Sequence, residues 1–462
     1  MQCYAERKTS HAKWLGDLPE HWECKKIGSL FSERKTKVSD KDYAPLSVAR
    51  IGVVPQLANA AKTNAGDNRK LVCAGDFAIN SRSDRKGSCG VSELDGSVSL
   101  INIILTPRNE WNGKYVHYLL RCQPFSEEYY RNGRGIVADL WTTRYSEMKS
   151  ILLPVPPREE QDQIVRFLDW KVSRINKLIS NYRHQIALLD EMKQRRIDEA
   201  VIKGMRKNTL VHNDDIRWDI DYPENWQIRR IKESFSFRKG LSITKANLEE
   251  TGIAVISYGQ IHSKKNSGIS LNEELIRYVN ESYLTTNQNC LVEKGDFIFA
   301  DTSEDVTGCG NCAYIDWDDT IFAGYHSIIA HPNESANNKY LAYLFKSPTW
   351  RYQIRKKVNG VKVYSITQKM LKDVFILIPP INEQEEIIKH LDEMCTKIDT
   401  IIKKMEEKIT NLQDLKIRLI ADTVTGKIDV RDIEIPEYEF VDEVADNDAE
   451  EDGEENTEEQ EE

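Results

Sequence analysis

The sequence predicts an α+β protein in which two similar globular domains are joined by two long antiparallel coiled-coil helices, as a dumbbell with pseudo-two-fold symmetry. Three observations lead to this prediction. The chain has 462 residues, which is too long for a single core. Five short sequence patterns occur twice in the same order. A regular spacing of apolar residues then follows the last pattern in each half.

The two halves of the chain repeat each other. LPEHWECKKIGSLF from Leu18 resembles YPENWQIRRIKESF from Tyr222, and AGDFAI from Ala74 resembles KGDFIF from Lys294. The runs KYVHYLLRC, NGRGIV and PPREEQDQIVRFLD resemble KYLAYLFKS, NGVKVY and PPINEQEEIIKHLD. Five pairs in one order indicate an internal duplication. The predicted parts are globular domains at 1–155 and 205–378, helices at 156–204 and 379–431, and a tail at 432–462.

Each globular domain is expected to be rich in short strands. Apolar runs such as GDFIFAD and VFILIPP are bounded by Gly, Asn, Asp and Pro, which favour turns. The Pro-Pro pair after each domain ends the strand pattern and favours a helix start. Glu159, Glu160 and Glu383 would lie in the first helical turn, where negative charge is favourable.

The two predicted helices carry the clearest periodic signal in the chain. Apolar residues recur in steps of four and three, which is the pattern of a helix that packs along its length against another helix. Lys193 and Lys416 then continue the pattern at the same place in each half, and Gly204 and Gly426 are plausible helix ends. Each helix of about 45 residues would be roughly 70 Å long. The predicted seam residues are Leu168, Val172, Ile175, Ile179, Tyr182, Ile186 and Leu189, and Leu391, Cys395, Ile398, Ile402, Met405, Ile409 and Leu412.

Composition narrows the class of protein. No run of about 18 apolar residues is present, and the first residues lack the apolar stretch of a signal peptide, so we expect a cytoplasmic protein without a membrane span. The nine cysteines are irregularly spaced, which favours reduced thiols over a disulfide framework.

The net charge of −10 is unevenly distributed. Thirteen acidic residues and no Lys or Arg lie between Asp442 and Glu462, so the rest of the chain has a net charge of +3. Such charge runs are typical of solvated segments, and we expect residues 432–462 to form an acidic disordered tail. The alternative is a segment that imitates the charge of nucleic acid and competes for a basic surface.

The combination of motifs resembles the specificity (S) subunit of type I restriction-modification systems, up to about Arg431. The motifs are the two PPxxEQ helix starts, the P-x-x-W openings at Pro19/Trp22 and Pro223/Trp226, and the closing VTGKIDVR from Val424. The acidic end from Val441 departs from the family pattern.

The resemblance implies a role in DNA recognition. Each globular part would be a target-recognition domain that reads one half of a bipartite site in double-stranded DNA. The helices would set the spacer and dock two methyltransferase (modification) subunits, and restriction/translocase subunits would join the full assembly. No cofactor is expected on this chain, whereas S-adenosylmethionine and ATP/Mg are expected on the partner subunits.

Basic and polar residues in loops are the candidates for DNA contact, because Lys and Arg bind phosphates and polar side chains read base edges. Asn-Gly followed by a basic residue recurs in both halves and therefore carries the most weight, while Trp141 beside it is expected to pack. The candidates in the first domain are Arg82, Arg85, Lys86, Arg131 and Arg134. Those in the second are Tyr258, Gln260, His262, Lys264, Lys265, Lys356, Lys357, Lys362 and Tyr364, with Arg355 beside them.

The sequence offers little catalytic chemistry. Cys309 and Cys312 form half of a zinc site, with His326 and His331 nearby, but the first half has only Cys89 at the matching place, so we expect no metal. Neither a phosphate-binding loop nor an S-adenosylmethionine motif is recognisable. We therefore expect a non-catalytic subunit. The alternatives are a protein-binding scaffold that uses the helices without a DNA role, and an enzyme with a site at Cys309/Cys312.

Overall fold

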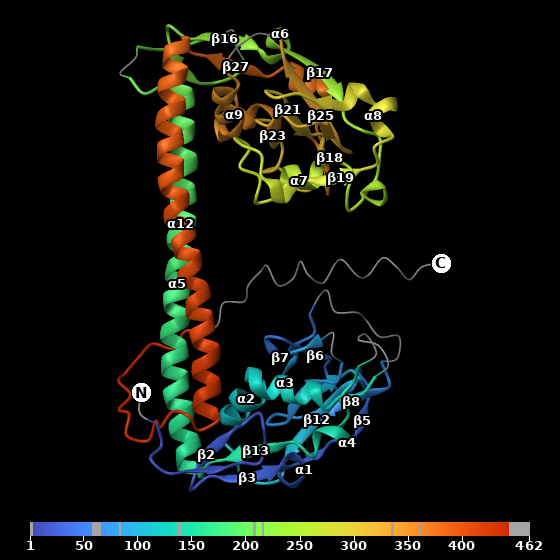
Figure 1. The fold of residues 1–462 in the computed structure, drawn as a ribbon, viewed down its shortest axis with the longest axis vertical. Coiled ribbons are helices and arrows are strands. Elements are labelled where there is room, and N and C mark those ends of the chain that lie inside the picture. The colour runs from blue at the N-terminus through green and yellow to red at the C-terminus, as the bar shows by residue number, and fades with distance from the viewer. Residues whose placement is uncertain are drawn as a thin grey trace. The chain divides into compact units, whose positions relative to one another are not determined.

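The computed structural model describes residues 3–57, 66–82, 85–135, 141–206, 209–214, 217–333, 337–360 and 362–442 (Figure 1). The chain divides into two compact units. The first unit comprises Met1–Arg183 and Glu406–Glu462, and the second comprises His184–Met405. Each unit contains a globular part and portions of the two long helices, α5 (Arg158–Lys203) and α12 (Ile381–Val424). The predicted α+β class, with two globular parts and two long helices, is confirmed. The boundary between the two units lies within each long helix, after Arg183 in α5 and after Met405 in α12.

The first unit is built around a four-stranded antiparallel sheet in the order β10-β9-β12-β4. Its core contains the aromatic side chains of Phe31, Phe77 and Phe125. The sheet strands are β4 (Phe31–Glu33), β9 (Phe77–Asn80), β10 (Cys89–Val91) and β12 (Asn102–Pro107). The other strands are β1 (Arg7–Thr9), β2 (Asp17–Pro19), β3 (Glu23–Lys26), β5 (Lys37–Val38), β6 (Leu46–Ala49), β7 (Gly52–Pro55), β8 (Arg69–Val72), β11 (Gly96–Val98) and β13 (Leu152–Val155). The helices are α1 (Ile27–Leu30), α2 (Gly113–Arg121), α3 (Gln123–Arg131) and α4 (Tyr145–Met148).

The second unit has a corresponding sheet in the order β23-β21-β25-β17, which is the same order of repeated elements. The sheet strands are β17 (Phe235–Lys239), β21 (Phe297–Ala300), β23 (Cys312–Tyr314) and β25 (Ser327–Pro332). A second sheet has the order β19-β18-β24-β20, with β18 (Ile253–Ile256), β19 (Arg277–Val279), β20 (Leu291–Val292) and β24 (Ile321–Ala323). The remaining strand pairs are β14 (Leu210–His212) with β15 (Asp221–Pro223), β16 (Gln227–Arg230) with β27 (Phe375–Ile378), and β22 (Thr302–Ser303) with β26 (Tyr364–Ser365).

Short helices complete the second unit. They are α6 (Ile231–Ser234), α7 (Tyr258–His262), α8 (Tyr283–Thr286), α9 (Asn338–Lys346), α10 (Pro348–Arg355) and α11 (Gln368–Lys372), with 3₁₀ turns at Lys245–Asn247, Glu273–Leu275 and Gln288–Cys290. Its core is rich in aromatic residues, and Phe345 packs 4.5 Å from Trp350 between ring centroids.

The repeated Gly-Asp pair forms the same turn in both units. Gly75 and Gly295 have φ of 89° and 102°, a conformation that glycine adopts without steric cost. The following carboxylate accepts a backbone hydrogen bond, from Cys73 N to Asp76 Oδ2 at 2.9 Å and from Glu293 N to Asp296 Oδ2 at 3.0 Å. The repeat therefore preserves the turn that leads into β9 and into β21.

The repeated PPxxEQ motif connects each helix start to its globular part. Gln161 Nε2 donates to Pro156 O at 3.0 Å, and Asn112 N donates to Gln161 Oε1 at 3.1 Å. In the second unit Gln384 Nε2 donates to Pro379 O at 2.7 Å. Both glutamines are buried, so a hydrogen-bonded partner is needed at both ends of the amide. This requirement explains why Gln follows Pro-Pro at the same distance in each half.

Along the long helices, all fourteen predicted seam residues are buried or half-buried. In the first unit, Lys416 Nζ lies 3.5 Å from Asn176 Oδ1 and Lys408 Nζ lies 5.5 Å from the ring centroid of Tyr182, so residue numbers rise on one helix as they fall on the other. In the second unit, Lys193 Nζ and Asp399 Oδ1 are 2.5 Å apart. The two helices are thus antiparallel neighbours within each unit.

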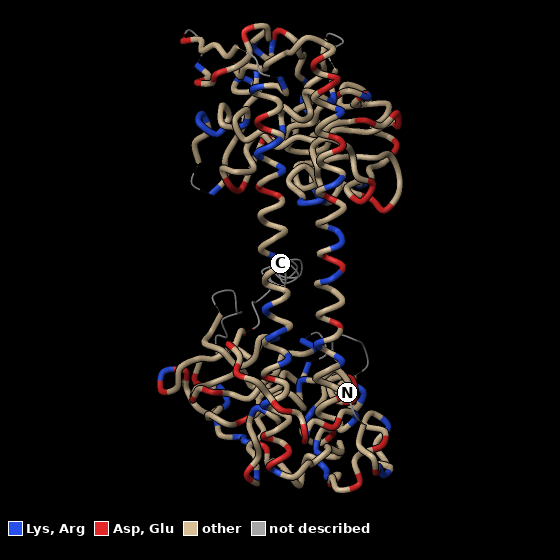
Figure 2. Tube along the Cα trace, turned by 90° about the vertical axis from the view of Figure 1, so that its left-hand side faces the viewer, with Lys and Arg blue, Asp and Glu red and all other residues tan. Residues whose placement is uncertain are grey.

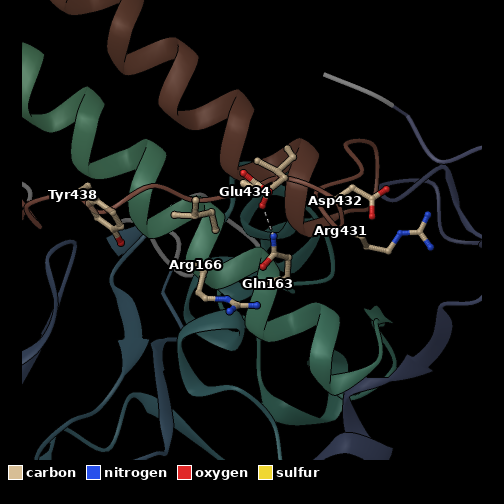
Figure 3. A pocket seen from close by; sticks show the side chains of 8 residues that line it. Gln163, Arg166, Arg431, Asp432, Glu434 and Tyr438 are labelled. Carbon is tan, nitrogen blue, oxygen red and sulfur yellow. Dashed lines mark hydrogen bonds between the residues drawn. The ribbon is translucent and has the colours of Figure 1, made fainter.

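The predicted disordered tail begins too early. Residues 428–442, which we name the C-terminal strap, run along α5 in the first unit (Figure 3). Gln163 Nε2 donates to Val430 O at 3.0 Å and to Ile433 O at 2.9 Å, and Asn176 Nδ2 donates to Val441 O at 3.1 Å. The strap is held because its apolar side chains, including Ile435, pack on the core of the first unit. The predicted tail from 443 to 462 lies outside the described residues.

Candidate nucleic-acid interface

Two basic loops of the first unit meet beside Thr142. Arg134 N donates to Thr142 O at 2.8 Å and Thr142 N donates back to Arg134 O at 3.0 Å. Thr143 N donates to Ser81 O at 2.9 Å, so Arg82 pairs with the other side of Thr142. The structure thereby brings Arg82 and Arg134 to one edge of the unit, with both residues exposed.

Tyr130 connects the remaining basic residues to this edge. Its hydroxyl donates to Arg85 O at 3.4 Å, and Lys86 Nζ lies 5.9 Å from the centre of its ring. Trp141 Nε1 donates to Tyr130 O at 2.8 Å. A Cβ on Gly133 would lie 2.3 Å from the Trp141 ring nitrogen, so the glycine of the repeated Asn-Gly pair makes room for the indole. Trp141 therefore packs on the turn that presents Arg134.

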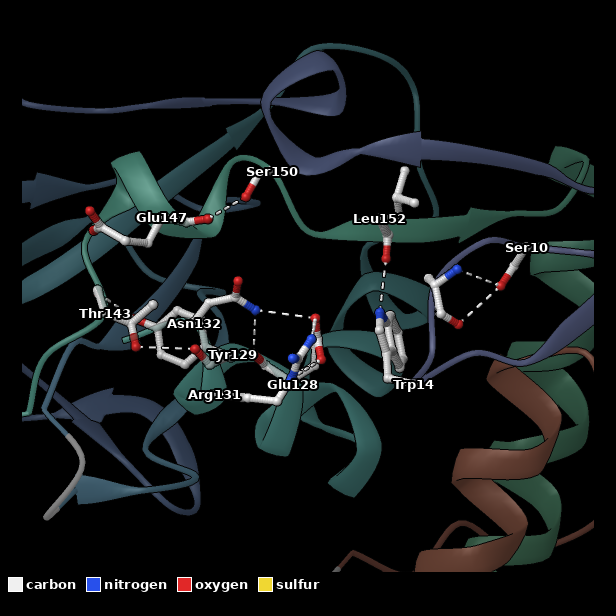
Figure 4. Close-up of polar contacts among 11 residues, drawn as sticks. Ser10, Trp14, Glu128, Tyr129, Arg131, Asn132, Thr143, Glu147, Ser150 and Leu152 are labelled. Carbon is white, nitrogen blue, oxygen red and sulfur yellow. Dashed lines mark hydrogen bonds and ion pairs between the residues drawn. The ribbon is translucent and has the colours of Figure 1, made fainter. Parts of the chain in front are cut away.

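Arg131 is the weakest candidate of this group. Its guanidinium makes two parallel hydrogen bonds to Glu128, at 2.8 and 2.7 Å (Figure 4). The hydrogen bond to Glu128 raises the pKa of the guanidinium further above its usual value. Since the fork is occupied by a carboxylate, Arg131 offers less to a phosphate than its exposed neighbours do.

In the second unit, the corresponding edge forms where β22 pairs with β26. Ser303 lies opposite Tyr364, and Ile366 N donates to Asp301 O at 2.7 Å. This pairing corresponds to the contact of Ser81 with Thr143 in the first unit, so the segment that follows the Asn-Gly pair is held at the same place in both units. Lys362, two residues before Tyr364, is exposed on this loop.

Helix α7 brings Tyr258 and His262 to the same edge. His262 Nε2 donates to Thr302 O at 2.8 Å, and Asn311 Nδ2 donates to His262 Nδ1 at 3.1 Å. Because both ring nitrogens are used within the protein, His262 positions the loop and is not available to read a base. Gln260 is partly used as well, since its Oε1 accepts a hydrogen bond from Ser257 N at 3.1 Å.

The other predicted lysines are more dispersed. Lys265 forms an ion pair with Glu274 at 2.5 Å, and both Lys264 and Lys265 are exposed. Lys356 and Lys357 follow the end of α10, and Lys357 Nζ donates to Asp373 O at 3.3 Å. Burial lowers the pKa of Lys357. The residues that converge on β22 and β26 are therefore Tyr258, His262, Lys362 and Tyr364.

Sequence reasoning missed Asp301, Tyr325 and His326 as members of this edge. His326 Nδ1 lies 3.2 Å from Asp301 Oδ1, and the rings of His326 and Tyr258 have centroids 5.6 Å apart. In the sequence, His326 stands out only as a possible zinc ligand near Cys309 and Cys312. Its positive φ of 53° and its approach to α7 depend on the tertiary structure. The only available signal was a polar aromatic pair, Tyr-His, placed directly after an apolar strand.

The Cys-x-x-Cys pair is buried in the second core. Cys309 and Cys312 have raised thiol pKa values because of burial, to about 11 for Cys312. His326 and His331 contact different carboxylates, Asp301 and Asp296. Among the described residues, no group of three or more His, Cys, Asp or Glu side chains is arranged to hold a metal ion.

Charge does not by itself mark one face. Figure 2 shows acidic and basic residues interspersed over both units. The candidate interface is therefore defined by the loops that converge at the end of each main sheet. None of the helices in the described parts of the chain combines the length and apolarity that a membrane span needs.

Comparisons with known proteins agree with this architecture. Residues 223–411 match the family described as type I restriction modification DNA specificity domain. The type I restriction enzyme MjaVIII specificity subunit of Methanocaldococcus jannaschii is 22% identical over 445 residues, which cover 94% of this chain and 99% of that protein. The EcoKI specificity subunit of Escherichia coli is 24% identical over 288 residues, or 60% of this chain and 58% of that protein.

A solved structure shows the same fold. It is described as "Structural basis underlying complex assembly and conformational transition of the type I R-M system". One of its chains aligns with a TM-score of 0.63 and 15% identity, covering 89% of this chain and 99% of that one.

Proposed function

The chain belongs to the family of type I restriction-modification specificity subunits, and from this premise we propose that each of its units contacts one half of a bipartite DNA site. The observation that supports this proposal most strongly is the duplicated edge. Arg82 pairs with Thr142 in the first unit as Thr302 pairs with Ser365 in the second. Each pair follows an Asn-Gly loop with an exposed basic residue, Arg134 in one unit and Lys362 in the other. Related folds with different loop residues suit the reading of two different half-sites.

The contacts divide by chemistry. Exposed Arg82, Arg134 and Lys362 supply charge for phosphates, which position a protein on DNA without reading its sequence. Tyr258 and Tyr364 supply polar aromatic groups for base edges or sugars. Arg131 and Lys265 are held by carboxylates and contribute less.

We further propose that the helices dock two methyltransferase subunits, and that restriction/translocase subunits join the assembly. The repeated helix starts, attached to each unit by the same Gln contacts, would offer equivalent surfaces to two copies of one partner. The chain itself acts as a non-catalytic subunit, and S-adenosylmethionine and ATP/Mg would be bound by the partner subunits.

Charge reversal tests the DNA interface. Arg134→Glu and Lys362→Glu should each weaken binding of the full chain to its target DNA at least tenfold. The slope of log affinity against log salt concentration should fall by about one, which corresponds to the loss of one phosphate contact. Lys404→Glu, an exposed charge change on α12, is the matched control.

Binding of target DNA that is unchanged by both loop variants would contradict a DNA interface at this edge. It would favour the scaffold alternative, in which the helices hold partners and the basic loops are incidental.

A further inference from the structure

The turn between β24 and β25 presents His326 at the candidate interface. The strand residues on either side of this turn, Ala323 and Ser327, are buried, whereas the His326 side chain is 57% exposed. The turn is fixed by backbone contacts, because Gly324 N donates to Ile256 O at 2.7 Å and Asp301 N donates to His326 O at 3.1 Å. The imidazole is therefore carried on a rigid support.

The backbone at His326 is held in a conformation that few side chains adopt. Its φ is 53°, in the left-handed region where glycine is the residue of lowest cost. Backbone strain of this kind persists where the surrounding structure fixes it, and it concentrates at functional sites. A turn that served only to connect two strands would favour glycine at this position. The presence of histidine instead indicates that the imidazole side chain has a role of its own.

The imidazole is oriented from two sides. Asp301 Oδ1 lies 3.2 Å from Nδ1 of His326, so the Nδ1–H group donates a hydrogen bond to the carboxylate. The other ring nitrogen, Nε2, is then directed away from Asp301. The rings of Tyr258 and Tyr325 lie at 5.6 and 6.0 Å between centroids, both edge-on. In the described part of the chain, Nε2 has no hydrogen-bond partner. This arrangement holds one polar atom ready for an external group.

The corresponding position in the first unit is Ile101. β25 and β12 are equivalent strands, and their first residues pair with equivalent ends of the neighbouring strand, Ser327 with Ala300 and Asn102 with Asn80. Ile101 therefore matches His326, and it is 38% exposed. The two units thus present different chemistry at one place in the fold, a polar ring in one and a branched apolar side chain in the other.

We propose that the residue preceding this strand reads a base edge in each unit, with His326 accepting or donating a hydrogen bond in a DNA groove and Ile101 making an apolar contact. A thymine methyl group is the base feature that an apolar side chain recognises in the major groove. Asp301 is a positioning residue that orients His326. The inference rests on the proposed function, because it assumes that this edge faces DNA.

The test uses the full chain assembled with the methyltransferase subunits of its host, followed by mapping of methylated sites in host DNA and binding to site variants. His326→Asn is the main variant, because Asn tolerates a positive φ. It should relax discrimination at one base pair in one half-site by roughly 5- to 150-fold. Its salt dependence should stay that of the unmodified chain, because phosphate contacts are retained.

Two further variants separate reading from folding. Ile101→Thr should alter preference at one base pair of the other half-site and nowhere else. Asp301→Asn should relax the same base pair as His326→Asn, with unchanged thermal stability, which a purely structural carboxylate would not produce. Lys362→Ala, a phosphate-contact control, should weaken binding to all site variants equally.

The outcomes distinguish the two proposals. If His326→Asn and Ile101→Thr keep the original methylation motif while Lys362→Ala weakens binding, the edge contacts DNA but the turn does not read it. If the unmodified assembly shows no sequence preference in binding or methylation, the proposed function fails and this inference fails with it.

Discussion

At the scale of single residues, Asp392 connects a globular part to a helix. Its carboxylate accepts hydrogen bonds from Lys339 Nζ and Tyr343 Oη, both at 2.7 Å, and the Tyr343 side chain is buried. Asp169 does the same in the first unit, with Lys114 at 3.0 Å and Tyr118 at 2.9 Å. These contacts explain why the KYxxYL run recurs.

Removal of this carboxylate should destabilise the second unit. Asp392→Ala leaves the buried Tyr343 hydroxyl without its acceptor, and the free energy of unfolding should fall by about 2 kcal/mol. Urea unfolding measures this change. Glu393→Ala, the exposed neighbour on the same helix, should change the free energy by less than about 0.5 kcal/mol. Equal effects of the two variants would contradict a special role for Asp392.

His117 on α2 should make the first unit sensitive to acid. Burial, together with the positive charges of Arg121 and Lys114, lowers the pKa of His117 to about 3. The unfolded chain takes up a proton near pH 6.5 that the folded chain does not, so stability is present above that pH and is lost as pH falls toward 3. Between these two pH values, His117 lowers the free energy of unfolding by about 1.4 kcal/mol for each unit by which the pH falls.

The His117→Gln variant tests this linkage. The free energy of unfolding of the variant, measured between pH 6 and pH 4, should depend on pH less steeply than that of the unmodified chain by about that slope. His390→Gln, which replaces an exposed histidine on α12, is the matched control. Parallel pH profiles for His117→Gln and the unmodified chain would show that His117 does not carry the effect.

At the scale of elements, adjacent residues on α5 have opposite environments. Ile179 is 6% exposed within the first unit's core, whereas Leu178 is 46% exposed. Ile179→Ala should therefore lower the free energy of unfolding by about 2–4 kcal/mol, because it leaves a cavity between the helices. Leu178→Ala should cost less than about 0.5 kcal/mol. Thermal or urea unfolding of the two variants compares them directly, and equal losses would mean that the seam is not as predicted.

The elements also show what the sequence could predict. The helix starts and the four-three spacing depend on local order along the chain, so α5 and α12 could be inferred from residues alone. The pairing of β22 with β26 joins residues about 60 positions apart, and it follows from no local pattern. For the same reason the loops could be named as basic, but the convergence of Tyr258, Asp301 and His326 could not.

The C-terminal strap was missed for a different physical reason. Charge dominates the composition of its surroundings, and a charged stretch predicts solvation. Ile433 and Ile435 nevertheless alternate with charged Asp432 and Glu434, a pattern that suits an extended segment with one buried side. Core packing of these few side chains decides the outcome for residues up to 442.

At the scale of the whole molecule, segments that lie far apart in the sequence, residues 4–19 and 424–431, meet within the first unit. A Cβ on Gly426 would lie 2.5 Å from Pro19, and the Arg431 guanidinium lies 5.1 Å from the ring centroid of Tyr4. Tyr115 Oη also donates to Val424 O at 3.2 Å. The second unit makes the equivalent bond, from Tyr340 Oη to Val201 O at 3.2 Å, within a continuous stretch of chain. The first unit is therefore assembled from two separate stretches of the chain.

Truncation separates the strap from the acidic residues beyond it. Ending the chain after Lys427 removes fully buried Val430 and the partners of Gln163 and Asn176, and the first unit should lose roughly 3–6 kcal/mol of stability. Hydrogen exchange measures the effect unit by unit, and faster exchange should be confined to the first unit because the strap contacts belong to it. Ending the chain after Asp442 keeps every contact named here and should leave both units unchanged. Equal hydrogen exchange in the two truncated chains would mean that the C-terminal strap does not stabilise the first unit. Faster exchange in both units of the shorter chain would mean that the two units do not unfold independently.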